Sequence, residues 1–301
     1  MSIDEENLKN EILAGVQEVR SSKDWTAFLE KKAQLPNYSW GNVFLILRQY
    51  PEASFVAGYT TWKKVGNPVR KGERGISITA PYIKKDEETG EKIISGFGKA
   101  TVFDISQTVQ GIDWLGMPDR KLKGSAPELL EKLKSLITDN DIKLIERVIP
   151  DPACNGRTYV LNTGERVIEV QESLEDVMKI KTLLHEMTHA VLHQNIEDYA
   201  IHRGAAEVEA ESGAFVLGKM LGIDTGSYTF NYINAWLESV DENIDDAIQN
   251  ALKNVDVAVK IWGEKISEKF GVEFSLSKTL EKKIQHQPSP SIQSEVDRIN
   301  L

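Results

Sequence analysis

Apolar residues recur at helical spacing through the first fifty positions of the chain. One such pattern covers residues 4–34 and is interrupted near Ser21, so we predict two consecutive helices there. A second pattern covers residues 39–49, with Ser39 in the position of a helix cap and Pro51 directly after the end. The chain is therefore expected to begin with a helical segment.

The pattern changes between residues 54 and 106, where glycine and proline divide the chain into short segments. Apolar and polar residues alternate over residues 76–81, and further strand-forming residues cover 92–106. The intervening segment, Asp86-Glu-Glu-Thr-Gly90, predicts a turn. Helices followed by a small sheet predict an α+β domain over residues 1–120.

The second half of the chain has the pattern of a helix-rich domain with a small sheet. A linker rich in glycine and charged residues covers 111–124, and Ser125 caps the helix that follows it. The predicted elements are, in order, a helix at 128–136, strands at 142–148, 157–161 and 166–170, two helices that include residues 177–192 and 204–218, and helices at 228–252 and 255–269. We assign residues 125–270 to this second domain and expect the polar segment 271–301 to be a loosely ordered tail.

The helix predicted around residues 177–192 contains the motif His-Glu-Met-Thr-His at positions 185–189. A spacing of four residues places His185 and His189 on one helix face, where two imidazoles can bind one divalent ion. Glu186 stands beside the first histidine and can reach a water molecule on that ion. The alternative is a buried helix whose histidines only pack. The chain has 5 histidines in 301 residues, so chance is a weak explanation of the motif.

A zinc site of this type needs a third protein ligand, and Glu207 on the following helix is the best candidate. The longer metzincin motif is excluded because Leu192 stands where that motif has glycine. The segment between His189 and Glu207 is long enough for a loop between two antiparallel helices, and the spacing resembles the thermolysin-like gluzincin pattern. His193 and His202 are alternative ligands of lower rank.

Two further glutamates lie close to the predicted third ligand. Glu211 follows Glu207 by four residues and shares its helix face, so we expect it to accept a hydrogen bond from a ligating imidazole and to fix the orientation of that ring. Glu209 lies between them in sequence, and we expect it to point elsewhere and be solvated. The alternative for the whole cluster is an exposed acidic face without a metal.

These residues predict metal-assisted hydrolysis of a peptide bond. The ion would lower the pKa of water toward ~7 and polarise a carbonyl group, and Glu186 would be the catalytic base. Zinc is the expected ion, although manganese, cobalt and nickel also accept two histidines and one glutamate. The side chains available to stabilise an oxyanion are Tyr199, His202, Arg203, Tyr228 and Tyr232.

Composition narrows the class of protein. The chain is 41% hydrophobic and 27% charged, which is typical of globular domains. A continuous run of about 18 apolar residues is missing, so we expect no membrane association. The first residues are acidic and do not resemble a signal peptide, and Cys154 is the only cysteine. Together these features predict a cytoplasmic location.

The net charge of −10 is unevenly distributed along the chain. Residues 36–85 carry 8 basic and 2 acidic residues, so this segment is locally basic by +6 and suggests an anionic partner. Proteins that bind single strands combine cations for the phosphates with aromatic rings that stack on bases. The candidates are Tyr38, Trp40, Tyr59 and Trp62 for stacking, and Lys63, Lys64, Arg70, Lys71 and Arg74 for phosphate contacts. The alternative is that the tryptophans are core residues and the basic run is a solvated loop.

Several segments carry a resemblance to a known family. Tyr38-Ser-Trp40, Ala57-Gly-Tyr-Thr-Thr-Trp-Lys-Lys-Val-Gly66, Val69-Arg-Lys-Gly-Glu-Arg-Gly-Ile76 and Val102-Phe-Asp-Ile-Ser-Gln107 resemble the N-terminal domain of ArdC-type antirestriction proteins. Residues 153–222 are similar to the zincin domain that follows it in that family. The second helix of the predicted metal site, which includes residues 204–218, is also similar to that of the ImmA/IrrE metallopeptidases.

The resemblance implies a single-stranded-DNA-binding module followed by a zinc metallopeptidase-like domain, encoded on a mobile element and protecting incoming DNA from restriction. It also implies that His185, His189 and Glu207 are metal ligands and that Glu186 is the catalytic base. We therefore predict a DNA-binding zinc metallopeptidase of the antirestriction type. Two alternatives are open: a non-catalytic DNA-binding shield with a structural or vestigial metal site, and a regulatory protease that cleaves a repressor.

Overall fold

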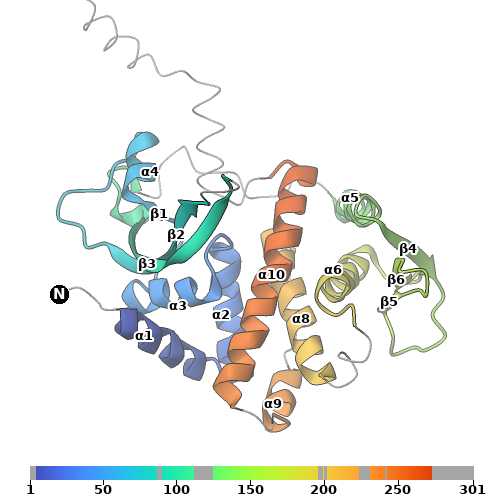
Figure 1. Ribbon diagram of the computed structural model, residues 1–301. Coiled ribbons are helices and arrows are strands. Elements are labelled where there is room, and N and C mark those ends of the chain that lie inside the picture. Colours follow the sequence, from blue (N-terminus) through green and yellow to red (C-terminus); the bar gives the residue numbers. More distant parts are fainter. Residues whose placement is uncertain are drawn as a thin grey trace, which may run out of the picture.

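Two small sheets and a set of helices make up the part of the chain that the computed structural model describes (Figure 1). The described residues are 5–86, 90–111, 125–195, 199, 202–223, 231–240 and 243–272. This mixed α+β architecture confirms the predicted fold class. Most of the predicted linker and nearly all of the predicted tail lie outside the described residues.

The N-terminal part begins with three helices, as the hydrophobic pattern predicts. Their bounds are α1 Glu5–Glu18, α2 Ser22–Gln34 and α3 Trp40–Gln49. The hydroxyls of Ser21 and Ser39 accept hydrogen bonds from the backbone N–H groups of Asp24 and Asn42. Each serine therefore caps the helix that follows it and satisfies a backbone donor that has no partner within the helix.

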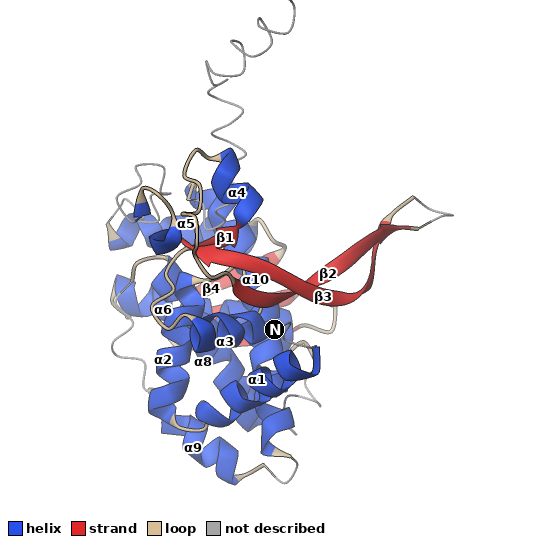
Figure 2. Cartoon of the chain, turned by 90° about the vertical axis from the view of Figure 1, so that its left-hand side faces the viewer, coloured by secondary structure: helices blue, strands red, loops and turns tan. Residues whose placement is uncertain are grey.

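An antiparallel sheet of three strands follows these helices. The elements are β1 Val56–Gly58, α4 Tyr59–Lys64, β2 Ile76–Lys85, β3 Lys92–Asp104 and the short 3₁₀ helix Ile105–Gln107. The strand order is β1-β3-β2, so β3 is central. Strands β2 and β3 continue beyond the rest of the sheet as a two-stranded projection, which we call the β2–β3 arm, from Pro81 paired with Phe97 to Lys85 paired with Lys92 (Figure 2).

The C-terminal part consists of a second small sheet and the helices around it. Its elements are α5 Ala126–Thr138, β4 Ile142–Arg147, β5 Gly156–Val160, β6 Arg166–Gln171, α6 Asp176–Leu192, α8 Arg203–Met220, α9 Asn231–Glu238 and α10 Ile244–Phe270. Strand β6 is central, parallel to β4 and antiparallel to β5, which leaves β5 at an edge. Helix α6 contacts both β5 and β6 on one side and α8 on the other. Within the described residues, no helix has both the length and the apolar character needed to span a bilayer.

The predicted boundary between the last two helices is wrong. Instead of a break between residues 252 and 255, α10 runs without interruption from Ile244 to Phe270, after the shorter α9. The segment across residues 252–255 contains no glycine or proline, and Leu252 and Val255 continue one buried face of the helix. The helix ends where Gly271 adopts a left-handed conformation with φ of 67°.

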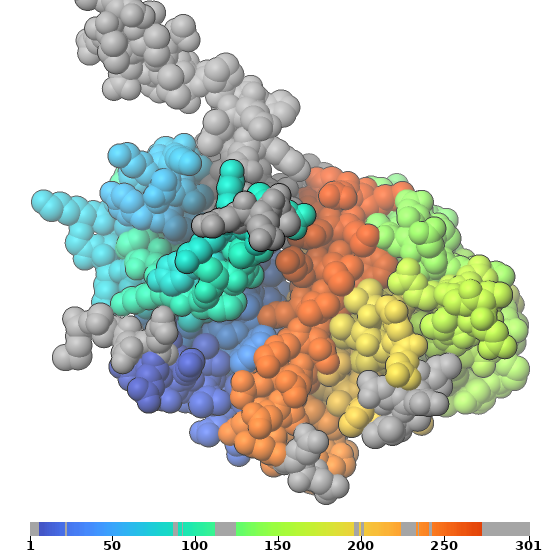
Figure 3. All heavy atoms as spheres, in the orientation of Figure 1, coloured from blue at the N-terminus to red at the C-terminus, as the bar shows by residue number. Residues whose placement is uncertain are grey.

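One continuous core joins the N-terminal and C-terminal parts of the molecule. Buried residues of α2, α3, α6, α8 and α10 belong to a single hydrophobic cluster, and α10 lies between the two parts in the space-filling view (Figure 3). Polar contacts cross the same boundary: the indole N–H of Trp25 donates to Ser212 over 2.9 Å, and the ammonium of Lys32 lies 2.7 Å from Asp256. The division into domains at residues 120–125 stays a prediction. The two parts share this core, and α8 of the C-terminal part packs against α2 of the N-terminal part.

Candidate metal centre

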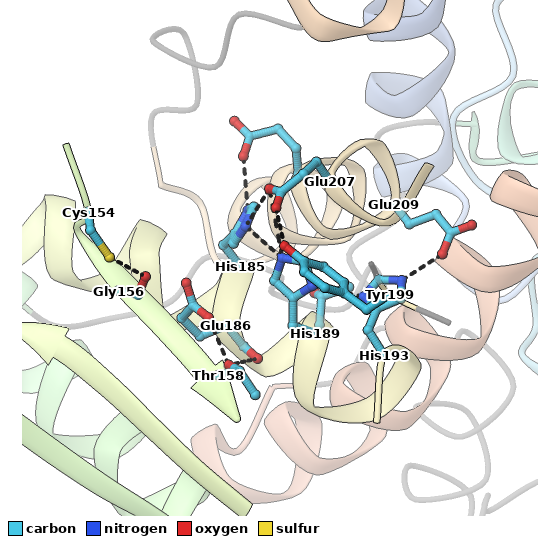
Figure 4. Close-up of polar contacts among 12 residues, drawn as sticks. Cys154, Gly156, Thr158, His185, Glu186, His189, His193, Tyr199, Glu207 and Glu209 are labelled. Atoms are coloured by element: carbon cyan, nitrogen blue, oxygen red, sulfur yellow. Dashed lines mark hydrogen bonds and ion pairs between the residues drawn. The ribbon is translucent and has the colours of Figure 1, made fainter. Parts of the chain in front are cut away.

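Helix α6 supplies the two histidines of the HExxH motif. One helical turn separates His185 and His189, so both side chains leave the helix on the face that looks toward α8 (Figure 4). Their Nε2 atoms lie 3.0 Å apart. This spacing is too short for two N–H groups to face each other, and it leaves at least one lone pair directed into the site.

Helix α8 brings a carboxylate to the same point. Oε2 of Glu207 lies 3.5 Å from Nε2 of His185 and 3.9 Å from Nε2 of His189. One potential ligand atom from each of these three residues lies within 4.8 Å of the other two, so within the described residues they form a group that could hold a metal ion. Two imidazoles and one carboxylate are the donor set of many catalytic zinc sites, and manganese accepts the same set. The residues present therefore fit a divalent metal ion.

Glu211 stands one turn beyond Glu207, as the sequence spacing predicts. Its Oε2 lies 3.1 Å from Nδ1 of His185, on the side of that ring away from the other donors. A hydrogen bond from Nδ1 to a carboxylate keeps the proton on Nδ1 and leaves the lone pair of Nε2 free for a metal. On the other side of the site, the hydroxyl of Tyr199 donates to Oε1 of Glu207 over 2.7 Å.

Burial and hydrogen bonds shift the pKa values of the groups in the centre in opposite directions. Burial opposes a charge on His185, but hydrogen bonds to Glu207 and Glu211 outweigh it and raise the pKa of His185 to about 10. Burial dominates at His189 and lowers its pKa to about 4, although Glu207 opposes this shift. Burial alone would raise the pKa of Glu207, yet hydrogen bonds from both rings and from Tyr199 bring it well below its usual range.

Glu186 points away from α8 and toward strand β5, into the same cleft (Figure 4). Its side chain is buried, and the hydroxyl of Thr158 lies 2.7 Å from Oε2 and 3.0 Å from the backbone oxygen of Glu186. Burial raises the pKa of this carboxyl group, while His185 and Thr158 oppose the rise. Gly156 makes the close approach of β5 possible, because a Cβ atom there would lie 2.6 Å from Thr182 and 3.1 Å from Glu186.

The prediction that Glu209 is solvated is wrong. Glu209 is 5% exposed, and its two oxygens accept hydrogen bonds from His193 and Asn254, each over 2.9 Å. His193 also contacts the centre itself, since its Nδ1 lies 2.8 Å from Nδ1 of His189. A buried carboxylate needs such partners to offset its desolvation. His193 therefore lies behind a ligand and is not placed in the ligand group.

The centre opens into a cleft of about 1210 Å³ between α6, α8, β5 and the C-terminal half of α9. Among the side chains considered for oxyanion stabilisation, Tyr199 and Arg203 line this cleft. His202 caps the start of α8, and Tyr228 and the side chain of Tyr232 lie outside the described residues. Cys154 also lines the cleft, where its thiol donates to the backbone oxygen of Gly156 and burial raises its pKa.

Two of the predicted stacking residues, Trp40 and Trp62, are buried, and a third, Tyr38, is partly buried. Trp62 is 0% exposed and its indole N–H donates to the backbone of Phe103, so it belongs to the small core under β1 and β3. Trp40 is buried at the start of α3 and packs edge-on against Phe44. The hydroxyl of Tyr38 donates to the backbone oxygen of Val56, and burial raises its pKa. The rings of Trp40 and Trp62 therefore cannot stack on a base without unpacking the core, whereas the ring of Tyr38 is partly exposed.

The remaining predicted DNA contacts lie at the surface. Tyr59 is exposed, as are Lys63, Lys64, Lys71 and Arg74. Arg70 is exposed as well, but its guanidinium is already bonded to Glu73 and to the backbone oxygens of Ser106 and Thr108. Large exposed aromatic side chains that the sequence did not single out are found on the β2–β3 arm, where Tyr82 and Phe97 are 58% and 61% exposed.

Comparison with known proteins relates the chain to one family and to a few individual proteins. Residues 5–103 match the family described as the N-terminal domain of anti-restriction factor ArdC. An uncharacterized protein of Bacillus anthracis, pXO2-81, is 26% identical over 255 residues, which are 72% of this chain and 43% of that protein. The chain thus spans less than half the length of this relative.

Two crystal structures of the antirestriction protein ArdC from plasmid R388 are also similar, at 21% identity. The metal-free structure matches over 77% of this chain and 86% of its own, with a TM-score of 0.45. The Mn(II)-bound structure matches over 76% of this chain and 84% of its own, with a TM-score of 0.44.

Proposed function

We propose, from the match of residues 5–103 to the ArdC N-terminal domain, that the protein is an antirestriction protein that combines single-stranded-DNA binding with a metal-dependent peptidase centre. The observation that carries the peptidase part is the convergence of His185, His189 and Glu207 within 4.8 Å, beside the buried carboxyl group of Glu186. The DNA-binding part is supported by the family of the N-terminal region and by the basic segment within it.

In this proposal His185, His189 and Glu207 hold the ion, which is zinc or manganese. A bound divalent ion would polarise a peptide carbonyl and lower the pKa of water. Glu186 takes a proton from the attacking water and returns it to the leaving amine, which is general base and then general acid catalysis. Its raised pKa suits this exchange, since a carboxyl group that is too acidic returns a proton poorly. Thr158 keeps the carboxyl group directed toward the cleft.

The peptidase proposal is tested with Glu186→Gln. We expect the variant to bind zinc or manganese as the wild type does, because Glu186 is not one of the three ligands, and to lose cleavage of proteins bound to single-stranded DNA by roughly 10²–10⁴-fold. The matched control is Glu165→Gln, which alters an exposed glutamate on the same part of the chain. Equal cleavage by the wild type and Glu186→Gln would refute the catalytic role.

A second candidate function is a DNA-binding shield without catalysis. It is favoured by one specific observation: exposed aromatic rings and lysines lie on α4 and the β2–β3 arm, within the residues that match the ArdC N-terminal domain. We propose that the DNA-contacting surface comprises the exposed rings of Tyr59, Tyr82 and Phe97 together with exposed lysines of α4 and the arm. In a conjugation assay the shield keeps full protection with Glu186→Gln and loses it with Lys63→Glu/Lys64→Glu. Loss of protection with Glu186→Gln would instead favour the peptidase.

A further inference from the structure

A buried row of polar side chains runs from the metal centre to helix α10. Nδ1 of His189 lies 2.8 Å from Nδ1 of His193, whose Nε2 lies 2.9 Å from Oε2 of Glu209. The other oxygen of Glu209 accepts from the side-chain amide of Asn254 over 2.9 Å. The side chains of His189, His193 and Glu209 are 9%, 11% and 7% exposed, so water has little access to the row. Figure 4 shows His193 between the centre and Glu209.

The direction of every hydrogen bond in this row is fixed by its far end. The carboxylate of Glu209 can only accept, so Nε2 of His193 carries the proton that lies between them. A neutral imidazole has one N–H group and one lone pair, and Nδ1 of His193 is therefore an acceptor. Nδ1 of His189 must then donate, which leaves its Nε2 with a free lone pair. That atom is the one that faces His185 and Glu207.

The two predicted histidine ligands are thus oriented by different means. His185 meets the carboxylate of Glu211 directly, whereas His189 reaches a carboxylate only through the ring of His193. The i,i+4 spacing that pairs His185 with His189 also pairs His189 with His193, so three rings form one row along α6. This explains why a glutamate on α8 that does not share a face with Glu207 is nevertheless buried.

We propose that His193 is the positioning residue of His189, that it fixes the tautomer presenting Nε2 to the metal, and that Glu209 acts through it. The inference rests on the metal site of the proposed function. It assigns Asn254 of α10 a supporting role, as the donor that occupies the second oxygen of Glu209 and offsets the burial of that carboxylate. Outer partners of this kind typically contribute 10–100-fold to metal affinity.

The test measures Mn(II) and Zn(II) affinity of the full chain with His193→Leu, Glu209→Leu and the double variant. We expect each single variant to weaken binding by roughly 10–100-fold. The double variant should bind no more weakly than His193→Leu, because Glu209 has no route to His189 once the ring is gone. Ser212→Ala is the matched control: it removes a buried polar contact of the same helix, to Trp25, without touching the row, and its metal affinity should equal that of the wild type.

The tautomers of His189 and His193 can be measured directly, and this measurement tests the positioning role separately from any general loss of stability. In the zinc-loaded protein, imidazole ¹⁵N chemical shifts should place the proton of His193 on Nε2 and that of His189 on Nδ1. A proton on Nδ1 of His193, unchanged affinity in His193→Leu, or a double variant that loses the product of the two single losses would each overturn the proposal. If the wild type binds neither metal, the proposed peptidase function fails with it, whereas wild-type binding that persists in all variants overturns this inference alone.

Discussion

The α6–α8 centre and the β2–β3 arm place side chains in opposite environments. In the centre, charged and polar groups are buried or half-buried, and the carboxylates of Glu207, Glu209 and Glu211 each have a hydrogen-bond partner. In the arm, Tyr82, Ile83, Ile94 and Phe97 are large, apolar and mostly exposed. Burying a charge requires exact pairing to offset desolvation, while an exposed apolar group loses stabilisation that only a partner can supply. The polar groups of the centre are thus paired within the chain, whereas the large apolar groups of the arm stay exposed, as the proposed DNA-contacting surface requires.

This contrast separates two kinds of aromatic residue in the N-terminal region. Trp62 belongs to a core, and Tyr82 and Phe97 belong to a surface, although all three lie within the part that matches the ArdC N-terminal family. Substitutions in the two groups should affect different measurements: the free energy of unfolding for the first and DNA affinity for the second. The predictions below are ordered by the size of the expected effect.

Trp62→Ala should destabilise the protein by about 3–5 kcal/mol, the usual range for removing a large aromatic side chain from a core. The indole is 0% exposed and its N–H group donates to Phe103 over 2.9 Å, so both packing and a hydrogen bond are lost. The measurement is the free energy of unfolding in urea. Tyr59→Ala, which alters an exposed ring on the same short helix, is the control and should change it little. A stable Trp62→Ala variant that no longer binds DNA would restore the original stacking interpretation.

The placement of His185, His189, Glu207 and Glu211 was predictable because helix periodicity is local. Two residues four positions apart share a helix face regardless of the tertiary structure. The paired histidines of one helix and the paired glutamates of the next can therefore face the same point. Glu209 was not predictable in this way. Its burial depends on Asn254, 45 residues away on a helix whose boundaries the sequence pattern placed wrongly.

Long-range packing also explains the errors in the N-terminal region. The interleaving of aromatic and basic residues around α4 has the composition of a nucleic-acid surface, but composition does not tell which ring a six-residue helix turns inward. The exposure of the arm has a related cause: β1 pairs only with residues 102–104 of β3, so residues 92–97 pair with β2 alone, and the sequence pattern does not show how far each strand is covered. The overall α+β class and the N-caps at Ser39 and Ser125 depend on local sequence features, and these predictions are confirmed.

Gly213→Ala should destabilise the centre, even though alanine favours helices over glycine by roughly 0.5–1 kcal/mol. A Cβ atom at this position would lie 2.8 Å from both Cγ2 and Oγ1 of Thr188, where α8 crosses α6. Overpacking of this kind costs about 1–3 kcal/mol, which exceeds the gain in helix propensity. Urea unfolding measures the loss, and metal affinity should fall with it because Glu207 lies on the displaced helix.

The control for this close approach is Thr188→Ala, which removes both of the opposing atoms. In the double variant Gly213→Ala/Thr188→Ala, the stability should return most of the way to that of Thr188→Ala alone. Strong coupling between the two positions is the signature of a steric contact. Additive losses would mean that the helices are not held at this distance by the glycine.

Tyr82→Ser/Phe97→Ser should leave the free energy of unfolding within about 0.5 kcal/mol, as expected of exposed positions away from any core. Single-stranded-DNA affinity should fall by about tenfold or more, because stacking on one base contributes roughly 1–3 kcal/mol. Fluorescence anisotropy with a labelled oligothymidine measures the binding. Thr101→Ser, an exposed position on β3 nearer its C-terminal end, serves as the control. Unchanged DNA affinity together with altered self-association would assign the arm to a protein partner.

Glu169 extends the rule of paired buried acids beyond the metal centre, and its effect should be the smallest. Its carboxylate accepts from Tyr159, Arg157 and Arg147 over 2.7, 2.6 and 2.9 Å, and its side chain is almost fully buried. Burial raises the pKa of this group, but the three hydrogen bonds outweigh it and lower the pKa below its ordinary value of 4.5. A carboxyl group whose pKa is lower in the folded chain contributes stability above its unfolded pKa, and this contribution disappears as the pH falls through the folded pKa.

The stability difference between the wild type and Glu169→Gln should thus be constant near neutral pH and shrink below about pH 4.5. Glu165→Gln, at an exposed position, should show no such trend. A difference that grows on acidification would mean that burial, and not the pairing, controls this acid, and the contrast between centre and arm would then not extend to the outer face of the sheet.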